Sequence, residues 1–125
     1  MKQKINLEAA FSQITEYWSP QIAGELNGQH VKLAKLKGEF VWHQHDEADE
    51  MFWVVEGQLQ LLLPHETIVL NPGELYIVPR GTQHKPVAEE EVKIMLFEPA
   101  GTINTGNHQN EFTQKAETWL RDKKG

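Results

Sequence analysis

Residues 38–57 read GEFVWHQHDEADEMFWVVEG, and residues 73–84 read GELYIVPRGTQH. The first segment contains His43, His45 and Glu50, and the second segment ends in His84. Imidazole nitrogens and carboxylate oxygens are common ligands of divalent transition metals in proteins. Three histidines and one glutamate make a complete ligand set, so the two segments together predict one metal site.

The spacing of His43 and His45 suits a shared metal ion. Side chains alternate between the two faces of a strand, so in a strand over residues 39–45 both imidazoles lie on one face, with Val41 beside them. An H-x-H pair by itself is more often a pair of partly exposed histidines. Its conjunction with a glutamate and a third histidine favours a metal site.

The strand predicted for residues 51–55 follows directly on the carboxylate ligand. Alternation groups Glu50 with Phe52 and Val54, which predicts that Glu50 faces the same cavity above an apolar floor. Asp49 would replace Glu50 as the ligand if the loop shifted by one residue. Alternation and the step to the next glycine both favour Glu50, and Asp49 stays a minor alternative.

The two segments resemble the two motifs of the cupin superfamily. In the first motif, a glycine, H-x-H, three or four residues, E, six residues and G are expected, and the chain supplies His43, His45, Glu50 and Gly57. In the second motif, G-x5-P-x-G-x2-H is met without a gap by Gly73, Pro79, Gly81 and His84. Every metal-ligand position of the family pattern is therefore filled.

The chain departs from the family pattern at two positions that are not ligands. Gly38 precedes His43 by one residue fewer than usual, and Ala88 stands where the second motif often has Asn. The short interval between the motifs is similar to that of compact single-domain cupins, including those that resemble mannose-6-phosphate isomerase. This resemblance implies an all-β fold, an antiparallel double-stranded β-helix that forms a jelly-roll barrel.

Helices are predicted to flank the strands of a single domain, residues 1–125, whose barrel core spans about residues 30–99. Apolar residues at helical spacing follow Asn6, which can cap a helix, and predict a helix from Leu7 to Trp18, within about residues 6–19. Residues 21–28 are interpreted as an irregular joint. A second helix is predicted at about residues 112–123, after a polar loop over residues 100–110.

Turn-forming residues separate the predicted strands. These strands lie at residues 30–37, 39–45, 51–55, 58–63, 67–70, 75–78 and 92–98. The first two are expected to form a hairpin, and Glu89–Glu91 is interpreted as a solvated turn before the last one. Short strands without helical crossovers indicate an antiparallel barrel or a two-sheet sandwich.

Composition narrows the possible chemistry and partners. The chain has no cysteine, so disulfides and thiolate ligands are excluded and a metal must be held by nitrogen and oxygen. No apolar run approaches the length of a membrane span, and the polar first residues predict a cytoplasmic protein without a membrane partner. The net charge of −6, without a dense basic patch, disfavours nucleic acid as a partner.

The predicted site favours an oxygen ligand. Three neutral imidazoles and one carboxylate leave a divalent ion (Fe, Mn, Ni, Zn or Cu) with a net charge near +1 and, if octahedral, two open positions. Such an ion favours an anionic or bidentate small molecule. Lys85 could add attraction, although loop cations are mostly solvated. The residues expected to line the pocket are Val41, Phe52, Val54, Tyr76, Arg80 and Gln83.

The remaining aromatic and histidine residues are interpreted as structural. Trp42 and Trp53 fall on the faces opposite the ligands, where large aromatics predict packing against a sheet edge, a helix or a second subunit. A homodimer is therefore expected, as is common among cupins. His30, His65 and His108 stand alone in the sequence and are interpreted as structural or exposed.

The leading hypothesis is a metal-dependent cupin that binds or transforms a small oxygenated, anionic metabolite. As an enzyme it would be dioxygenase-like or isomerase-like. No catalytic residue is assigned, because Glu50 is committed to the metal and no other carboxylate is clearly placed inside the barrel. The alternative is a non-catalytic module that binds or senses a small ligand and carries a structural metal.

Overall fold

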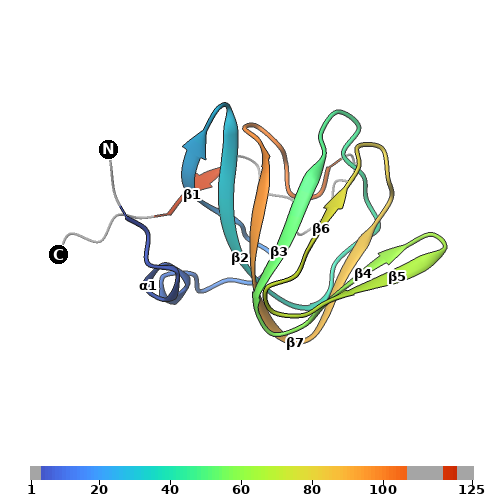
Figure 1. The fold of residues 1–125 in the computed structure, drawn as a ribbon, viewed down its shortest axis with the longest axis horizontal. Coiled ribbons are helices and arrows are strands. Elements are labelled where there is room, and N and C mark those ends of the chain that lie inside the picture. Colours follow the sequence, from blue (N-terminus) through green and yellow to red (C-terminus); the bar gives the residue numbers. More distant parts are fainter. Residues whose placement is uncertain (1–3, 107–116, 121–125) are drawn as a thin grey trace.

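The structure, a computed structural model, describes residues 4–106 and 117–120. Within these residues one short helix is followed by mostly antiparallel strands that curve into a β-barrel (Figure 1). The elements are α1 (Leu7–Ser12), β1 (Gln21–Leu26), β2 (Gln29–Glu39), β3 (Glu50–Glu56), β4 (Leu59–Leu63), β5 (Glu66–Leu70), β6 (Leu75–Val78), β7 (Lys85–Pro99) and β8 (Thr118–Trp119). The predicted all-β jelly-roll fold is confirmed.

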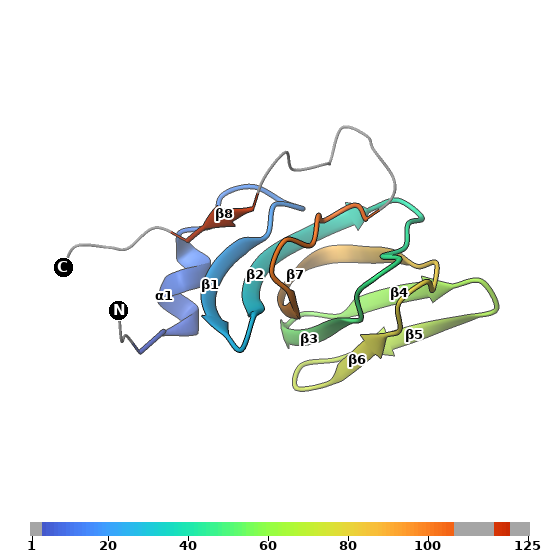
Figure 2. The same cartoon turned by 90° about the horizontal axis from the view of Figure 1, so that it is seen from above.

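Strand β7 closes the barrel because its two halves belong to different parts of the sheet. Residues 85–88 pair with β4 and with the end of β2, as in the facing pairs Val87–Gln60 and Ala88–Gly38. Residues 93–97 lie between β2 and β3. In Figure 2, β3 to β6 lie together on one side, while α1, β1 and β8 lie at the opposite end.

The strands between the two motifs follow the sequence prediction closely. Strands β3, β4, β5 and β6 begin and end within one residue of the predicted strands 51–55, 58–63, 67–70 and 75–78. The predicted turn at residues 89–91 is wrong, because these exposed residues lie inside β7 at a shift in its register with β2. The bend at this shift lets one strand serve both halves of the barrel.

The first hairpin is formed by other segments than predicted. Strand β2 runs through Gly38 and pairs with β1 and β7, so the hairpin of residues 30–37 with residues 39–45 is wrong. Strand β1 occupies residues for which the sequence predicts an irregular joint. The turn between β1 and β2 is Asn27-Gly28, with φ of 51° and 76°. This dipeptide with two positive φ angles is the usual signal of a two-residue hairpin.

The N-terminal helix is shorter than predicted. The Asn6 side chain caps it by accepting a hydrogen bond of 2.9 Å from the amide of Ala9, but α1 ends at Ser12. Trp18 has a φ of 62°, and its ring stacks on Phe40 in the barrel core at 4.6 Å between centroids. The helix packs elsewhere, with Phe11 in a separate apolar cluster. One straight helix therefore cannot place both Phe11 and Trp18.

The C-terminal helix is also corrected where the structure describes it. Thr118–Trp119 form β8, which pairs in parallel with β1, and the amide of Leu120 donates to the carbonyl of Ile22 at 2.8 Å. A helix over residues 112–123 is therefore wrong at these positions. The rest of that prediction, and His108, lie outside the described residues.

The barrel encloses one main apolar core. Inward-facing residues of the strands form it, namely Ala34, Leu36, Phe40, Phe52, Val54, Leu59, Leu61, Leu70, Val78, Ala88, Val92, Ile94 and Leu96, together with Trp18. A second cluster lies between α1 and the outer side of the sheet. In the described part of the chain, no helix is long and apolar enough to cross a membrane.

Candidate metal centre

Two backbone segments bring the histidines together. His43 and His84 form an isolated antiparallel bridge, in which each amide donates to the carbonyl of the other residue, at 3.0 Å and 2.9 Å. The carbonyl of His45 accepts a hydrogen bond of 2.8 Å from the amide of Gly81. The H-x-H segment is therefore held against the turn that delivers His84, although it is not part of a regular strand.

The Nδ1 atoms orient two of the imidazoles. Nδ1 of His43 lies 2.9 Å from the carbonyl oxygen of Val41, and Nδ1 of His84 lies 2.9 Å from that of Thr82. A carbonyl oxygen only accepts hydrogen bonds, so each Nδ1 carries the hydrogen and each Nε2 keeps its lone pair. This is the tautomer that binds a metal through Nε2.

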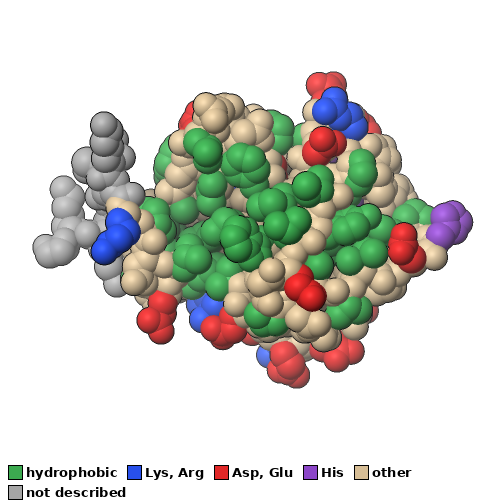
Figure 3. Space-filling view, viewed as in Figure 1, with side chains coloured by type: hydrophobic (Ala, Val, Ile, Leu, Met, Phe, Trp, Pro, Cys, Tyr) green, Lys and Arg blue, Asp and Glu red, His purple; other side chains and the backbone are tan. Residues whose placement is uncertain are grey.

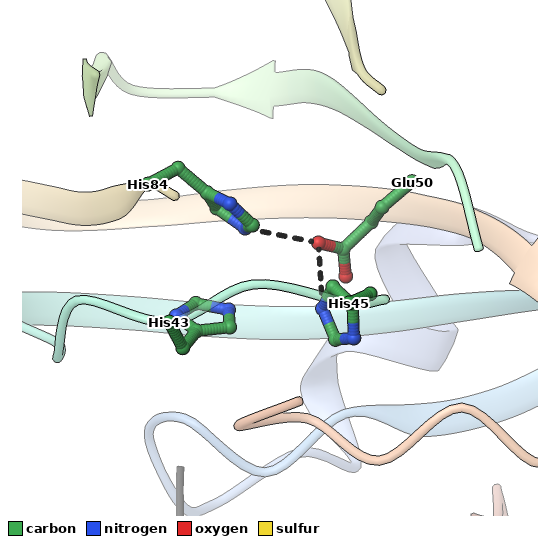
Figure 4. A group of neighbouring side chains, drawn as sticks. All are labelled: His43, His45, Glu50 and His84. Atoms are coloured by element: carbon green, nitrogen blue, oxygen red, sulfur yellow. Dashed lines mark ion pairs between the residues drawn. The ribbon is translucent and has the colours of Figure 1, made fainter. Parts of the chain in front are cut away.

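Glu50 completes the group from the start of β3. Its Oε1 lies 3.2 Å from Nε2 of His45 and 3.3 Å from Nε2 of His84 (Figure 4). All four residues are buried, and each offers one ligand atom such that these atoms lie within 4.8 Å of one another. The four side chains that the sequence singled out thus meet at one point.

The polar atoms at this point fit a cation. Nε2 of His45, Nε2 of His84 and Oε1 of Glu50 are buried without a hydrogen-bond partner among the described residues. Because Nε2 of His84 carries no hydrogen, its contact with Glu50 brings two lone pairs together. Buried polar atoms in this state are costly unless a metal ion lies between them. The group could therefore hold a divalent metal ion through nitrogen and oxygen.

The electrostatics of the group match the same role. Burial, with a smaller contribution from His84, lowers the pKa of His43 to about 4. Burial by itself raises the pKa of Glu50, but hydrogen bonds that His45 and His84 donate when they are protonated hold that pKa well below the usual range in the metal-free group. At neutral pH His43 is therefore neutral and Glu50 is ionised, and these are the forms that bind a metal.

Asp49 and the predicted loop cations lie outside this group. Asp49 is exposed and accepts a hydrogen bond of 2.8 Å from the amide of Arg80, whose Nε lies 3.5 Å from the same carboxylate. Lys85 is paired with Glu39 at 2.6 Å. These contacts direct the three charged groups of Asp49, Arg80 and Lys85 toward surface partners.

A small cavity adjoins the ligands inside the barrel and is partly open to solvent. Of the residues expected to line the pocket, Phe52 does so, whereas Val41, Val54 and Tyr76 pack in the surrounding core and Arg80 and Gln83 are exposed. The other lining residues include Trp18, Leu36, Phe40, Ile94, Leu96 and Glu98.

Sequence reasoning missed a buried charged network beside this cavity. Nζ of Lys32 lies 2.6 Å from Oε2 of Glu98 and 2.7 Å from Oε2 of Glu117. His30 does not stand alone but lies buried between Glu25 at 3.2 Å and Glu117 at 2.9 Å. Alternation along β2 and β7 was the available signal, because Lys32 and Glu98 share the inward faces of Leu36 and Ile94.

Gly106 supports the position of His45. Gly106 has a φ of 59°, and a Cβ there would collide with the carbonyl oxygen of Gln44 and lie 3.2 Å from Nδ1 of His45. We expect Gly106→Ala to displace this segment and to weaken metal affinity by about tenfold, as for other changes to groups that orient ligands.

The matched control for this prediction is Gly101→Ala. Gly101 has a similar positive φ of 93°, but no atom lies within 4 Å of the position that a Cβ would take, so the backbone penalty is present without the collision. Titration of both variants with a divalent metal separates the two effects. Equal losses of affinity would show that the contact with Gln44 does not position His45.

Comparisons with known proteins agree with this geometry. Residues 29–98 match the family described as Cupin domain. The uncharacterized protein YdbB of Bacillus subtilis (strain 168) is 35% identical over 86 residues, which cover 68% of this chain and 76% of YdbB. The crystal structure of a cupin-2 domain containing protein from Shewanella frigidimarina is 47% identical, with a TM-score of 0.75 and coverage of 76% of this chain and 93% of that one.

A second solved structure extends the likeness. Protein NMB1881 from Neisseria meningitidis is 30% identical, with a TM-score of 0.72, and the match covers 78% of this chain and all of that chain (100%). The matched family region contains all four residues of the candidate metal centre. It also contains strands β2 to β6 and all of β7 except its last residue. The chain belongs to the cupin family.

Proposed function

We propose that the protein holds one divalent transition metal ion through His43, His45, Glu50 and His84 and uses it to bind or transform a small oxygenated metabolite. The observation that carries this proposal is the convergence of buried lone-pair atoms, without hydrogen-bond partners among the described residues, beside a cavity. The ion is one of Fe, Mn, Ni, Zn or Cu, since the ligands are nitrogen and oxygen.

The metal ion and the protein would have different chemical roles in this site. A bound divalent ion supplies Lewis acidity, which polarises an oxygen of the ligand. The protein supplies the fixed ligand set and an apolar surround, in which Phe40, Phe52 and Leu96 line the cavity. Such a surround excludes water and strengthens electrostatic interactions inside the cavity.

The preference of this site for an anionic ligand would depend on the bound metal ion. None of the described residues that line the cavity is Lys or Arg. Attraction for an anionic ligand would therefore come from the bound ion and not from Arg80 or Lys85, which are paired elsewhere. Both enzymatic classes, dioxygenase-like and isomerase-like, use a metal that binds a carbonyl or enolate oxygen, and both suit this site.

The test begins with elemental analysis of purified protein, for which we expect close to one transition metal ion per chain. The metal-loaded protein is then offered 2-oxo acids, diols and sugar phosphates, with oxygen consumption and product formation measured. Turnover that disappears in His45→Ala supports an enzyme. Saturable binding without turnover supports a binding or sensing module. Failure to take up Fe²⁺, Ni²⁺, Mn²⁺ or Zn²⁺ contradicts the proposal.

We also propose that two copies of the chain associate through the outer face of β3 and β6. Trp53 faces Leu75 across these strands, and Met51 faces Ile77. Trp53, Leu75 and Ile77 are exposed in the single chain, and apolar side chains gather over this face (Figure 3). Contiguous exposed apolar surface of this kind is typical of protein interfaces.

Light scattering after size exclusion tests this association. We expect a dimer for the wild-type chain and a monomer for Trp53→Lys, because a charge in the centre of the apolar face opposes its burial. Val69→Lys is the control, since Val69 is a similarly exposed apolar residue on β5. A monomeric wild-type chain, or a dimer that both variants retain, would contradict this interface.

A further inference from the structure

Glu98 is a second carboxyl group that faces the candidate metal centre from inside the barrel. It lies near the end of β7, is only 2% exposed, and lines the cavity together with His43 and Glu50. Its carboxyl group lies close enough to that of Glu50 for the two to interact electrostatically. The four proposed metal ligands do not include Glu98, so the burial of its carboxyl group needs another explanation.

One oxygen of Glu98 is firmly held. Oε2 lies 2.6 Å from Nζ of Lys32, which is itself 2% exposed. Lys32 in turn contacts Oε2 of Glu117 at 2.7 Å and donates to the carbonyl oxygen of Thr102 at 3.0 Å. Because Lys32 is fixed from three directions, the carboxyl group of Glu98 is fixed in orientation as well. Lys32 is thus a positioning residue.

The other oxygen of Glu98 has no donor. Oε1 is buried without a hydrogen-bond partner among the described residues, and the nearby carboxyl group of Glu50 offers no donor when it is ionised. The cavity is otherwise lined mainly by apolar side chains, including Phe40, Phe52 and Ile94, with His43 and Asn104 as further polar residues. A buried oxygen in this position costs free energy until a ligand supplies a hydrogen-bonding group.

We infer that Glu98 is a ligand-recognition residue, whose free Oε1 forms a hydrogen bond with a hydroxyl group that the ligand carries beside its metal-binding oxygen. This inference rests on the proposed function of the metal centre. A hydroxyl group donates to a carboxylate or accepts from a carboxylic acid, so the match does not depend on the charge of Glu98. The ligand class is then that of 2-hydroxy acids, hydroxy-carbonyl compounds and vicinal diols.

Selectivity for a ligand with a hydroxyl group follows from the burial of Oε1 of Glu98. A site built to hydrogen-bond a hydroxyl group discriminates strongly against the analogue that lacks it, because the buried group is then left unpaired. A matched pair of probes is lactate and propionate, which share a metal-binding carboxylate and differ in the 2-hydroxyl group. Chelation of the metal by lactate contributes equally in every variant, so only the change in the affinity ratio reports on Glu98.

The experiment uses Co²⁺-loaded protein, whose visible absorption reports both metal occupancy and ligand binding. The wild-type chain and Glu98→Leu are titrated with lactate and with propionate. We expect the lactate-to-propionate affinity ratio to fall by about tenfold in Glu98→Leu, through loss of lactate affinity. Glu98→Gln, whose amide still donates and accepts, retains part of the ratio. An unchanged ratio in Glu98→Leu overturns the inference.

Two further variants keep the test decisive. Lys32→Met/Glu98→Leu replaces the whole buried ion pair by apolar groups, which proteins often tolerate, and gives the same lowered ratio if Glu98→Leu alone does not fold. Glu39→Leu is the control, because Glu39 pairs with Lys85 at the same 2.6 Å but does not line the cavity, and it keeps the wild-type ratio. A wild-type chain that binds no Co²⁺ contradicts the metal centre and this inference with it; Co²⁺ binding with an unchanged ratio contradicts the inference alone.

Discussion

Glu50→Gln is expected to lower the affinity for a divalent metal ion by at least about 100-fold, whereas Asp49→Asn leaves it within about threefold. Changes to groups that only orient ligands cost roughly 10- to 100-fold, and Glu50 is the one anionic ligand of the group. Its Oε1 lies between Nε2 of His45 and Nε2 of His84. Asp49 instead contacts Arg80 on the surface.

The two substitutions are closely matched. Each replaces a carboxylate by its amide at neighbouring positions in the chain, so general effects of charge on metal binding are shared. Competition with a coloured chelator measures both affinities, and circular dichroism checks that both variants fold. Equal losses, or a larger loss in Asp49→Asn, would assign the carboxylate ligand to the wrong residue and would restore Asp49 as the candidate.

Acid is expected to destabilise the metal-free protein through His43. Its pKa is lowered to about 4 in the folded chain, first by burial and then by His84. In the unfolded chain the pKa returns to about 6.5. Between these two values the unfolded chain binds a proton that the folded chain does not, so the free energy of unfolding falls as pH drops from about 6.5 to 4. The contribution of His43 to this loss is about 3 kcal/mol.

Urea unfolding of the metal-free protein at pH 7 and at pH 4 measures this loss. Glu98 acts in the opposite direction, because burial and the facing Glu50 raise its pKa well above the usual range, and its protonation favours the folded chain as pH falls. The comparison with His43→Gln isolates His43, and we expect a clearly smaller loss in this variant. His65→Gln, which changes an exposed histidine, should follow the wild type. If His43→Gln loses as much stability as the wild type, the neutral buried state of His43 is wrong.

The candidate metal centre is accessible from the sequence because its residues lie in two short segments at fixed spacings. Alternation places His43 and His45 together, and the structure brings them together by another route, since residues 40–49 hold only an isolated bridge in place of the predicted strand. The side chains of His43 and His45 still point as they would in a strand, because one pair of backbone hydrogen bonds between His43 and His84 imposes the local geometry of a strand.

The N-terminal helix shows why periodicity alone can mislead. Trp18 continues the apolar spacing of the helix, but its indole Nε1 donates to the carbonyl of Lys37 at 2.9 Å and its ring packs on Phe40. Tertiary packing of one large aromatic side chain outweighs the small propensity difference that would extend a short helix. The sequence pattern shows that Trp18 is apolar, but it does not show which apolar cluster the side chain joins.

Glu98 is a charged residue inside the barrel whose position the sequence pattern did not predict. Charged residues in strands are usually exposed, so the sequence places no carboxylate other than Glu50 inside the barrel. Along β7, however, Glu98 alternates in phase with Val92, Ile94 and Leu96, which are all buried. Its pairing with Lys32 depends on the register of β2 against β7, which the sequence pattern does not contain.

The most direct test of the metal centre is anomalous diffraction from crystals of the metal-loaded protein, measured on both sides of the absorption edge of the bound metal. We predict a single strong peak per chain at about 2.0–2.2 Å from the ligand atoms of His43, His45, Glu50 and His84. A peak at exposed histidines such as His65, or no peak between these four side chains in protein shown to contain one metal ion per chain, would contradict the proposed metal centre.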